Sequence, residues 1–180
     1  MRSLTVPPVS TIALPGIAGR LLLSPCPGRW STPAGSEREA SAALIDDLAH
    51  IVTLGAYGMV SLVEAPELPG GRVQFAAAVE RAGLRWAHLP IRDFGIPDDN
   101  FALSWQRLDL LGRLRAGESW AMHCRAGLGR TGTMAAQLLV EAGQAPADAI
   151  ATIRRQHAAE AVETAAQAQY LMSLPPRMAG

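Results

Sequence analysis

Short segments that suit β-strands alternate with segments of helical periodicity through most of this chain. The segments that suit strands cover residues 59–63, 84–89 and 120–123, and the helical segments cover residues 36–54, 73–82, 101–115 and 131–142. The run at 59–63 is apolar and bounded by Gly58 and Glu64, which is typical of a strand buried on both faces. Strands that alternate with helices build a parallel sheet. The pattern therefore predicts an α/β protein with a central, mainly parallel sheet flanked by helices.

The two ends of the chain have a different character. Residues 1–35 are rich in proline and glycine and predict turns with one short strand at residues 20–24. Two further helices are expected at residues 146–157 and about 161–171. A length of 180 residues with 49% hydrophobic residues suits one domain with a full-sized core. We expect a single domain over 1–180, in which 36–180 form the core behind the N-terminal turns.

Composition excludes several classes of function. Lys plus Arg equals Asp plus Glu at 16 each, so the chain has no global basic field of the kind that attracts nucleic acids. No apolar stretch reaches the roughly 18 residues needed to span a membrane, and the first residues are a poor match to a signal peptide. Only two cysteines are present, which favours a reducing, cytoplasmic location over a disulfide framework.

The segment AMHCRAGLGRTGT, residues 121–133, joins the strand expected at 120–123 to a helix. Ligands of such sheets bind at the carboxyl ends of the strands, where Cys124 stands. Gly127 and Gly129 let the backbone turn its N–H groups inward, and the following helix adds unpaired N–H groups and a positive dipole end. The loop is therefore predicted to bind a phosphate.

The same loop suits nucleophilic chemistry. A cysteine near a helix N-terminus and an arginine has a stabilised thiolate, which is the reactive form. Arg130 can donate two hydrogen bonds to phosphoryl oxygens and follow their charge into the transition state. The hydroxyl of Thr131 could stabilise the Cys124 thiolate as a leaving group. A metal site is disfavoured, because only His123 lies nearby and no second Cys/His pair has ligand spacing.

The run HCRAGLGRTG resembles the signature of the cysteine-dependent protein phosphatases, His-Cys, five residues, Arg, then Ser or Thr. It looks most like the dual-specificity branch, which includes kinase-associated and cell-cycle phosphatases. The resemblance implies a phosphocysteine at Cys124, assistance from Thr131, and a loop held by hydrogen bonds of His123. It implies a phosphorylated protein or peptide substrate, inhibition by phosphate-like oxyanions, and no metal or cofactor. The phosphate would bind to the loop positions, which are Arg125, Ala126, Gly127, Leu128, Gly129 and Arg130.

A phosphatase also needs a proton donor for the leaving oxygen, and the loop holds no carboxylate. The strand expected at 84–89 should lie parallel to and beside 120–123, so the polar loop 91–100 can reach Cys124. That loop contains Asp93, Asp98 and Asp99. HLPIRDFGIPDD resembles the family's acid loop, a pattern of Pro, a hydrophobic residue, Asp, Gly and Pro, and this match selects Asp93. Asp98 is the alternative acid, and Asp99 or the next residue is expected to cap the following helix.

Several residues keep two interpretations. Arg125 either adds positive potential at the pocket mouth or is a solvated side chain, and the same holds for Arg92. Gln167 resembles a family glutamine that positions water, but glutamine is also common on exposed helix faces. Cys26 could form a protective disulfide with Cys124, as in some relatives, or remain apart from it. The histidines at positions 50, 88 and 157 are expected to be structural or solvated.

Alternative functions use the same residues. A phosphoinositide or other small-phosphoester phosphatase would need the same site, and the basic Arg125 permits it. A non-catalytic phosphoprotein-binding module would usually lack Cys124 or Arg130, and both are present. A rhodanese-like sulfurtransferase fits the signature and the acid loop poorly. The favoured interpretation is a phosphatase for phosphotyrosine in proteins, whose pocket, if shallow, also admits phosphoserine and phosphothreonine.

Overall fold

A computed structural model describes residues 8–30 and 36–175 of the chain. One five-stranded sheet forms the centre, in the order β1-β2-β5-β3-β4. Strand β1 is antiparallel to β2, and every other neighbouring pair is parallel. The strands are β1 (Ser10–Ala13), β2 (Arg20–Ser24), β3 (Gly58–Ser61), β4 (Arg85–His88) and β5 (Trp120–His123). The predicted α/β class with a mainly parallel sheet is confirmed.

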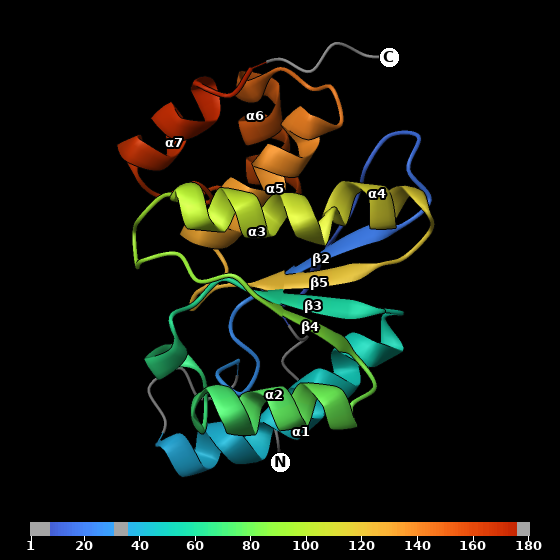
Figure 1. Cartoon of the computed structure of the whole chain (residues 1–180), viewed down its shortest axis with the longest axis vertical. Helices are drawn as coiled ribbons and strands as arrows, with labels where there is room; N and C mark the ends of the chain where they lie inside the picture. Colours follow the sequence, from blue (N-terminus) through green and yellow to red (C-terminus); the bar gives the residue numbers. More distant parts are fainter. Residues whose placement is uncertain (1–7, 31–35, 176–180) are drawn as a thin grey trace.

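Helices cover both faces of this sheet. Helices α1 (Glu37–Thr53) and α2 (Gly71–Arg81) lie on one face, and the helices from α3 onward lie on the other (Figure 1). The second group comprises α3 (Asp99–Leu108), α4 (Leu110–Arg115), α5 (Gly129–Glu141), α6 (Pro146–Gln156) and α7 (Ala165–Met172). Helix α5 is buried from Gly129 to Val140, so it forms the centre of its layer. No helix within residues 8–30 and 36–175 has the length and apolarity to cross a membrane.

Three predictions about this architecture were wrong. Strand β1 was not predicted. The helix expected at 101–115 is broken at Asp109, whose φ of 47° is left-handed, and the Asp109 side chain then caps α4 by accepting from the N–H of Gly112. Strands β4 and β5 are parallel but not adjacent, because β3 lies between them. The carboxyl ends of β3, β4 and β5 nevertheless lie along one edge of the sheet, and the site is built there.

Candidate active site

Cys124 follows β5 directly and is almost fully buried, with 3% of its surface exposed. It lies in a cavity of about 100 Å³. Three separate segments line this cavity, namely the loop after β4, the loop after β5, and the connection between α6 and α7. The lining residues are Asp93, Phe94, Cys124, Arg125, Ala126, Arg130 and Glu163. The structure therefore brings Cys124, Arg130 and Asp93 together, as the sequence predicted.

The loop after Cys124 leads straight into α5. Helix α5 begins at Gly129, two residues earlier than predicted, and Leu128 at its N-cap provides no side-chain cap. The first N–H groups of the helix thus remain free to meet an anion. Gly127 has a φ of 78°, and its carbonyl accepts a 2.6 Å hydrogen bond from Nε2 of His157. Nδ1 of His157 lies 2.9 Å from the Ser10 hydroxyl, so this histidine ties the loop to β1.

His123 connects the start of the loop to the sheet. Its Nδ1 lies 3.0 Å from the Cys124 carbonyl, which can only accept, so Nδ1 carries the proton. Nε2 then accepts from the Ser61 hydroxyl at 2.6 Å, and Ser61 accepts from the indole N–H of Trp86 at 2.9 Å. Complete burial lowers the pKa of His123 to about 4, which keeps the ring neutral. The chain of donors runs from β4 through β3 to the Cys124 carbonyl.

Arg130 is 2% exposed, and each of its two terminal nitrogens donates to neighbouring acceptor oxygens. Nη1 donates to Glu67 Oε2 at 2.8 Å and to the Ile91 carbonyl at 3.1 Å. Nη2 donates to Glu67 Oε1 at 2.9 Å and lies 3.0 Å from Asp93 Oδ1. Burial alone would lower the pKa of Arg130, but the Glu67 carboxylate outweighs it and the pKa is raised. The guanidinium is therefore held in one orientation, facing the pocket of Cys124.

Glu67 is the functional residue that sequence reasoning missed. It ends a short 3-10 helix, Ala65–Glu67, that follows β3. Burial raises the pKa of its carboxyl, but hydrogen bonds from Arg130 and the Glu64 N–H prevail, and the pKa is lowered. The available signal was its position, since EAPE follows an apolar run whose carboxyl end meets the same sheet edge as Cys124.

The aspartates of the acid loop have separate positions. Asp93 lines the cavity with its side chain 54% exposed, and its Oδ1 also accepts from the N–H of Phe94. Asp98 is absent from the lining and caps α3 by accepting from the N–H of Phe101 at 2.8 Å. The expectation that Asp99 or the residue after it would cap this helix was therefore wrong. Asp99 is instead the first residue of the helix, and the residue before it, Asp98, is the N-cap.

Two buried polar side chains adjoin the loop. Thr131 is fully buried, and within the described chain its hydroxyl has no hydrogen-bond partner. Gln167 is also fully buried rather than exposed on a helix face. Its side-chain oxygen accepts from the Thr164 N–H, and its amide nitrogen donates to the Gly95 carbonyl at 3.2 Å. Gln167 thus joins the start of α7 to the acid loop.

The remaining candidates differ in exposure. Arg125 is exposed at the cavity, whereas Arg92 is exposed but absent from its lining. Cys26 is buried beside the loop, and its N–H donates to the Arg125 carbonyl at 3.0 Å. Both cysteines are free thiols, and burial raises the pKa of Cys26 to about 12. Among the described residues, no group of three His, Cys, Asp or Glu side chains could hold a metal ion.

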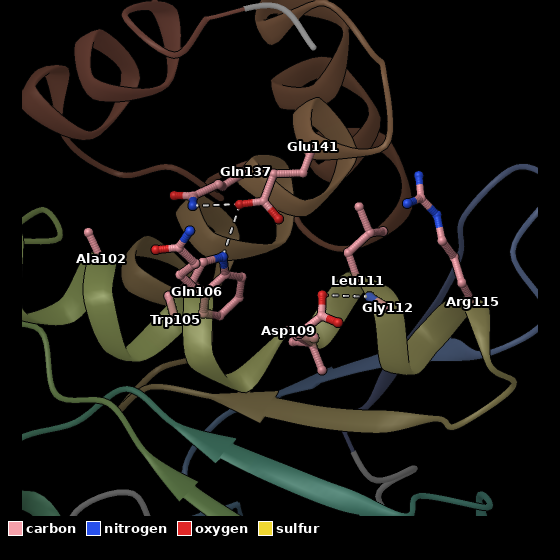
Figure 2. Close-up of a pocket in the computed structure, with 10 residues that line it drawn as sticks. Ala102, Trp105, Gln106, Asp109, Leu111, Gly112, Arg115, Gln137 and Glu141 are labelled. Atoms are coloured by element: carbon pink, nitrogen blue, oxygen red, sulfur yellow. Dashed lines mark hydrogen bonds between the residues drawn. The ribbon is translucent and has the colours of Figure 1, made fainter. Parts of the chain in front are cut away.

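A larger cavity of about 300 Å³ lies between α3, α4 and α5 and shares no residue with the Cys124 pocket (Figure 2). Three hydrogen bonds join groups that line it. Glu141 accepts from Trp105 Nε1 and Gln137 Nε2, both at 2.9 Å, and Asp109 caps α4. No cysteine, serine or threonine lines it, and its two carboxylates hold neighbouring groups of α3, α4 and α5.

Comparison with known proteins assigns most of the chain to one family. Residues 30–178 match the family described as "Swiss Army Knife protein, DSP-PTPase phosphatase domain". No match was found among curated proteins.

Several solved structures with the same fold carry the name of a phosphatase. Tk-PTP in its active form is 30% identical, covers 97% of this chain and 100% of its own, and superposes with a TM-score of 0.70. Kinase associated phosphatase (KAP), with its catalytic-site cysteine replaced by serine, is 24% identical over 94% of each chain with a TM-score of 0.78. A putative protein tyrosine phosphatase from Leishmania major is 22% identical over 93% of this chain and 98% of its own, with a TM-score of 0.67.

Proposed function

This chain belongs to the DSP-PTPase phosphatase domain family of Swiss Army Knife proteins, and from that premise we propose that it hydrolyses phosphotyrosine in proteins through a phosphocysteine intermediate. Phosphoserine and phosphothreonine are further substrates under the proposal. One observation carries it. The buried Cys124 lies in one small cavity with Arg130 and Asp93, a nucleophile, an anion receptor and a proton donor.

In the first step, the Cys124 thiolate attacks phosphorus and the ester P–O bond breaks. The leaving oxygen takes its proton from the carboxyl of Asp93, which becomes a carboxylate. Arg130 and the backbone N–H groups from Arg125 to Arg130 hold the non-bridging oxygens, where charge accumulates. Glu67 orients the guanidinium for this task through its paired hydrogen bonds.

In the second step, water hydrolyses the phosphocysteine. Asp93, now a carboxylate, takes a proton from the water as its oxygen attacks phosphorus, and the S–P bond breaks. The buried hydroxyl of Thr131 donates to the departing Cys124 thiolate, which gives this otherwise unpartnered group a role. Gln167 supports the acid loop through its bond to the Gly95 carbonyl. Inorganic phosphate then leaves, and no step requires a metal or cofactor.

Asp93 Oδ1 lies 3.0 Å from Nη2 of Arg130. A phosphate in the cavity would compete with Asp93 for Nη2 of Arg130. Under the proposal, substrate binding releases Asp93 from the guanidinium and leaves it free to turn toward the leaving oxygen. Its half-exposed side chain has room for that change.

Phosphoinositide hydrolysis is the second candidate, because the exposed Arg125 at the cavity could meet a further phosphate. The test is a panel of phosphotyrosine, phosphoserine and phosphothreonine peptides and short-chain phosphoinositides, assayed in EDTA with wild type and Cys124→Ser. We expect vanadate-sensitive hydrolysis of the peptides by the wild type and none by the variant. Activity that survives Cys124→Ser would overturn the proposed mechanism, and exclusive activity on phosphoinositides would favour the second candidate.

A further inference from the structure

Glu163 lines the same cavity as Cys124, yet the proposed reaction gives it no task. It lies in the connection between α6 and α7, far in sequence from the other lining residues. Its carboxylate sits over the start of α5. Oε2 of Glu163 lies where it would crowd a Cβ at Gly129, which places this carboxylate against the first residue of α5.

The backbone around Glu163 is held from two sides. Arg154 on α6 donates to the carbonyl of Ala161 at 3.1 Å and to that of Val162 at 3.3 Å. The N–H of Val162 donates to the Leu128 carbonyl in the phosphate loop at 3.3 Å. Val162 is buried and has a φ of 63°, which is unfavourable for a β-branched residue and persists only where neighbours fix it. The fold thus uses a strained residue to present Glu163 at the cavity.

The charged side chains that line the cavity have different roles in the proposed reaction. Arg130 and the loop N–H groups bind the reacting phosphate, and Asp93 must carry a proton to serve as the acid. The charged groups left for the rest of the substrate are Arg125 and Glu163. A second anion beside the scissile phosphate is repelled by the Glu163 carboxylate, and a cation there is attracted to it. Such rim charges act mainly on partner choice.

We infer that Glu163 is a specificity-determining residue that selects phosphopeptides with arginine or lysine beside the phosphorylated residue and disfavours substrates with a second anionic group there. This inference rests on the proposed function only in requiring that the cavity bind phosphomonoesters. It narrows the substrate class of the site to phosphoesters in basic sequence surroundings.

The test uses two phosphotyrosine peptides that differ only in flanking residues, arginine in one and glutamate in the other. The measured quantity is the ratio of kcat/KM for the two peptides at low ionic strength. We expect wild type to favour the arginine peptide by about tenfold, and E163Q to reduce that ratio to about twofold. E160Q is the matched control, because Glu160 is exposed on the same connection and absent from the cavity. It should keep the wild-type ratio, and added salt should shrink that ratio.

Peptide binding to Cys124→Ser, with and without E163Q, separates this inference from the proposed reaction. Binding that favours the arginine peptide and loses this preference in E163Q supports the inference even if wild type hydrolyses neither peptide, a result that would overturn only the proposed function. An unchanged ratio in E163Q overturns the inference. An equal fall in kcat on both peptides also overturns it, since Glu163 would then act in the chemistry. Failure to bind either peptide overturns both proposals.

Discussion

The carboxylate of Glu67 accepts two hydrogen bonds from the guanidinium of Arg130, at 2.8 and 2.9 Å, across 63 positions of sequence. Glu67 is largely shielded from solvent and Arg130 almost completely so. A fork of this kind fixes the plane of the guanidinium as well as its position. The orientation of the Arg130 guanidinium therefore depends on the segment after β3 as well as on the loop after β5.

Substitution of Glu67 should disturb this arrangement. In Glu67→Gln, one oxygen acceptor becomes an NH2 donor that faces a buried cation. We expect kcat/KM on p-nitrophenyl phosphate to fall by about 10- to 100-fold, because small misplacements of a catalytic group have large effects. The control is Glu80→Gln, since Glu80 is exposed on α2. Equal activity of Glu67→Gln and wild type would show that Arg130 holds its orientation without this pair.

Asp93 and Asp98 provide a direct comparison of two nearby carboxylates. Asp93→Asn should lower kcat on phosphopeptides by roughly 100-fold or more without raising KM, because proton transfer is lost while Arg130 and the loop N–H groups still bind the phosphate. Asp98→Asn should keep kcat, since Asn is also a good N-cap for α3. Steady-state kinetics on both variants test the assignment. Loss of kcat in Asp98→Asn but not in Asp93→Asn would make Asp98 the acid.

The lowered pKa of His123 predicts that the stability of the fold depends on pH. Its pKa is about 4 in the folded protein and about 6.5 in an unfolded chain. The unfolded state therefore binds more protons between these values, so His123 makes the fold less stable as pH falls from about 6.5 to 4. The expected loss is of the order of 3 kcal/mol. Urea unfolding from pH 7 to pH 4.5 measures it, and an imidazole nitrogen spectrum that reports a neutral, Nδ1-protonated ring at pH 5.5 supports the cause. A ring protonated at that pH would contradict it.

The titration of Asp47 has the opposite effect on stability, and this effect must be separated from that of His123. Burial raises the pKa of Asp47 to about 6, so the folded state binds the extra proton as pH falls, and this group favours the fold at low pH. The unfolding series is therefore best run in an Asp47→Asn background. The loss attributed to His123 should be steeper there than in the wild type.

The two cysteines should react differently. Cys26 is fully buried and its pKa of about 12 keeps it a thiol at neutral pH. Cys124 lines an open cavity and is the proposed thiolate nucleophile. Iodoacetamide at pH 7.5 should modify Cys124 and leave Cys26 intact, as read by peptide mass mapping, and both should react in urea. Equal labelling of both in the folded protein would contradict this order.

Local features of the chain were predictable, and relations between distant segments were not. Strands 20–24 and 120–123 match the structure because runs buried on both faces carry their own signal. Strand β1 lies at the sheet edge with only one of its residues buried, and lacks that signal. The place of β3 between β4 and β5 depends on non-local pairing. Aspartate adopts a left-handed backbone more often than most residues but still only occasionally, so its presence at position 109 did not by itself predict a break in the helix.

The residues of the site also divide into those found through a local motif and those whose role depends on distant segments. Cys124, Arg130 and Thr131 lie within one motif, and Asp93 was found through its loop pattern. Glu67 carries no motif, and its role depends on the two oxygens that meet Arg130 across the sheet edge. Gln167 was judged ambiguous because periodicity on a short helix cannot show that a particular side chain is buried against Gly95.

Gly127 allows a test of the phosphate loop that separates backbone strain from steric contact. Its φ is 78°, and a Cβ there would lie 2.7 Å from the carbonyl carbon and oxygen of Ser24. Gly83 has nearly the same φ, 79°, but a Cβ there would meet nothing within 4 Å. Both substitutions to alanine carry the cost of a left-handed residue, about 1 kcal/mol. Only Gly127→Ala must also push the loop away from β2.

We therefore expect Gly83→Ala to lose about 1 kcal/mol of unfolding free energy and to keep wild-type kcat/KM. Gly127→Ala should lose more stability and reduce kcat/KM by about 100-fold, because the displaced loop no longer aims its N–H groups at the phosphate. Urea unfolding and steady-state kinetics on the two variants measure both effects. Equal stability losses with full activity in Gly127→Ala would show that the loop tolerates a side chain against Ser24. The close approach of the two backbones would then not be what shapes the anion receptor.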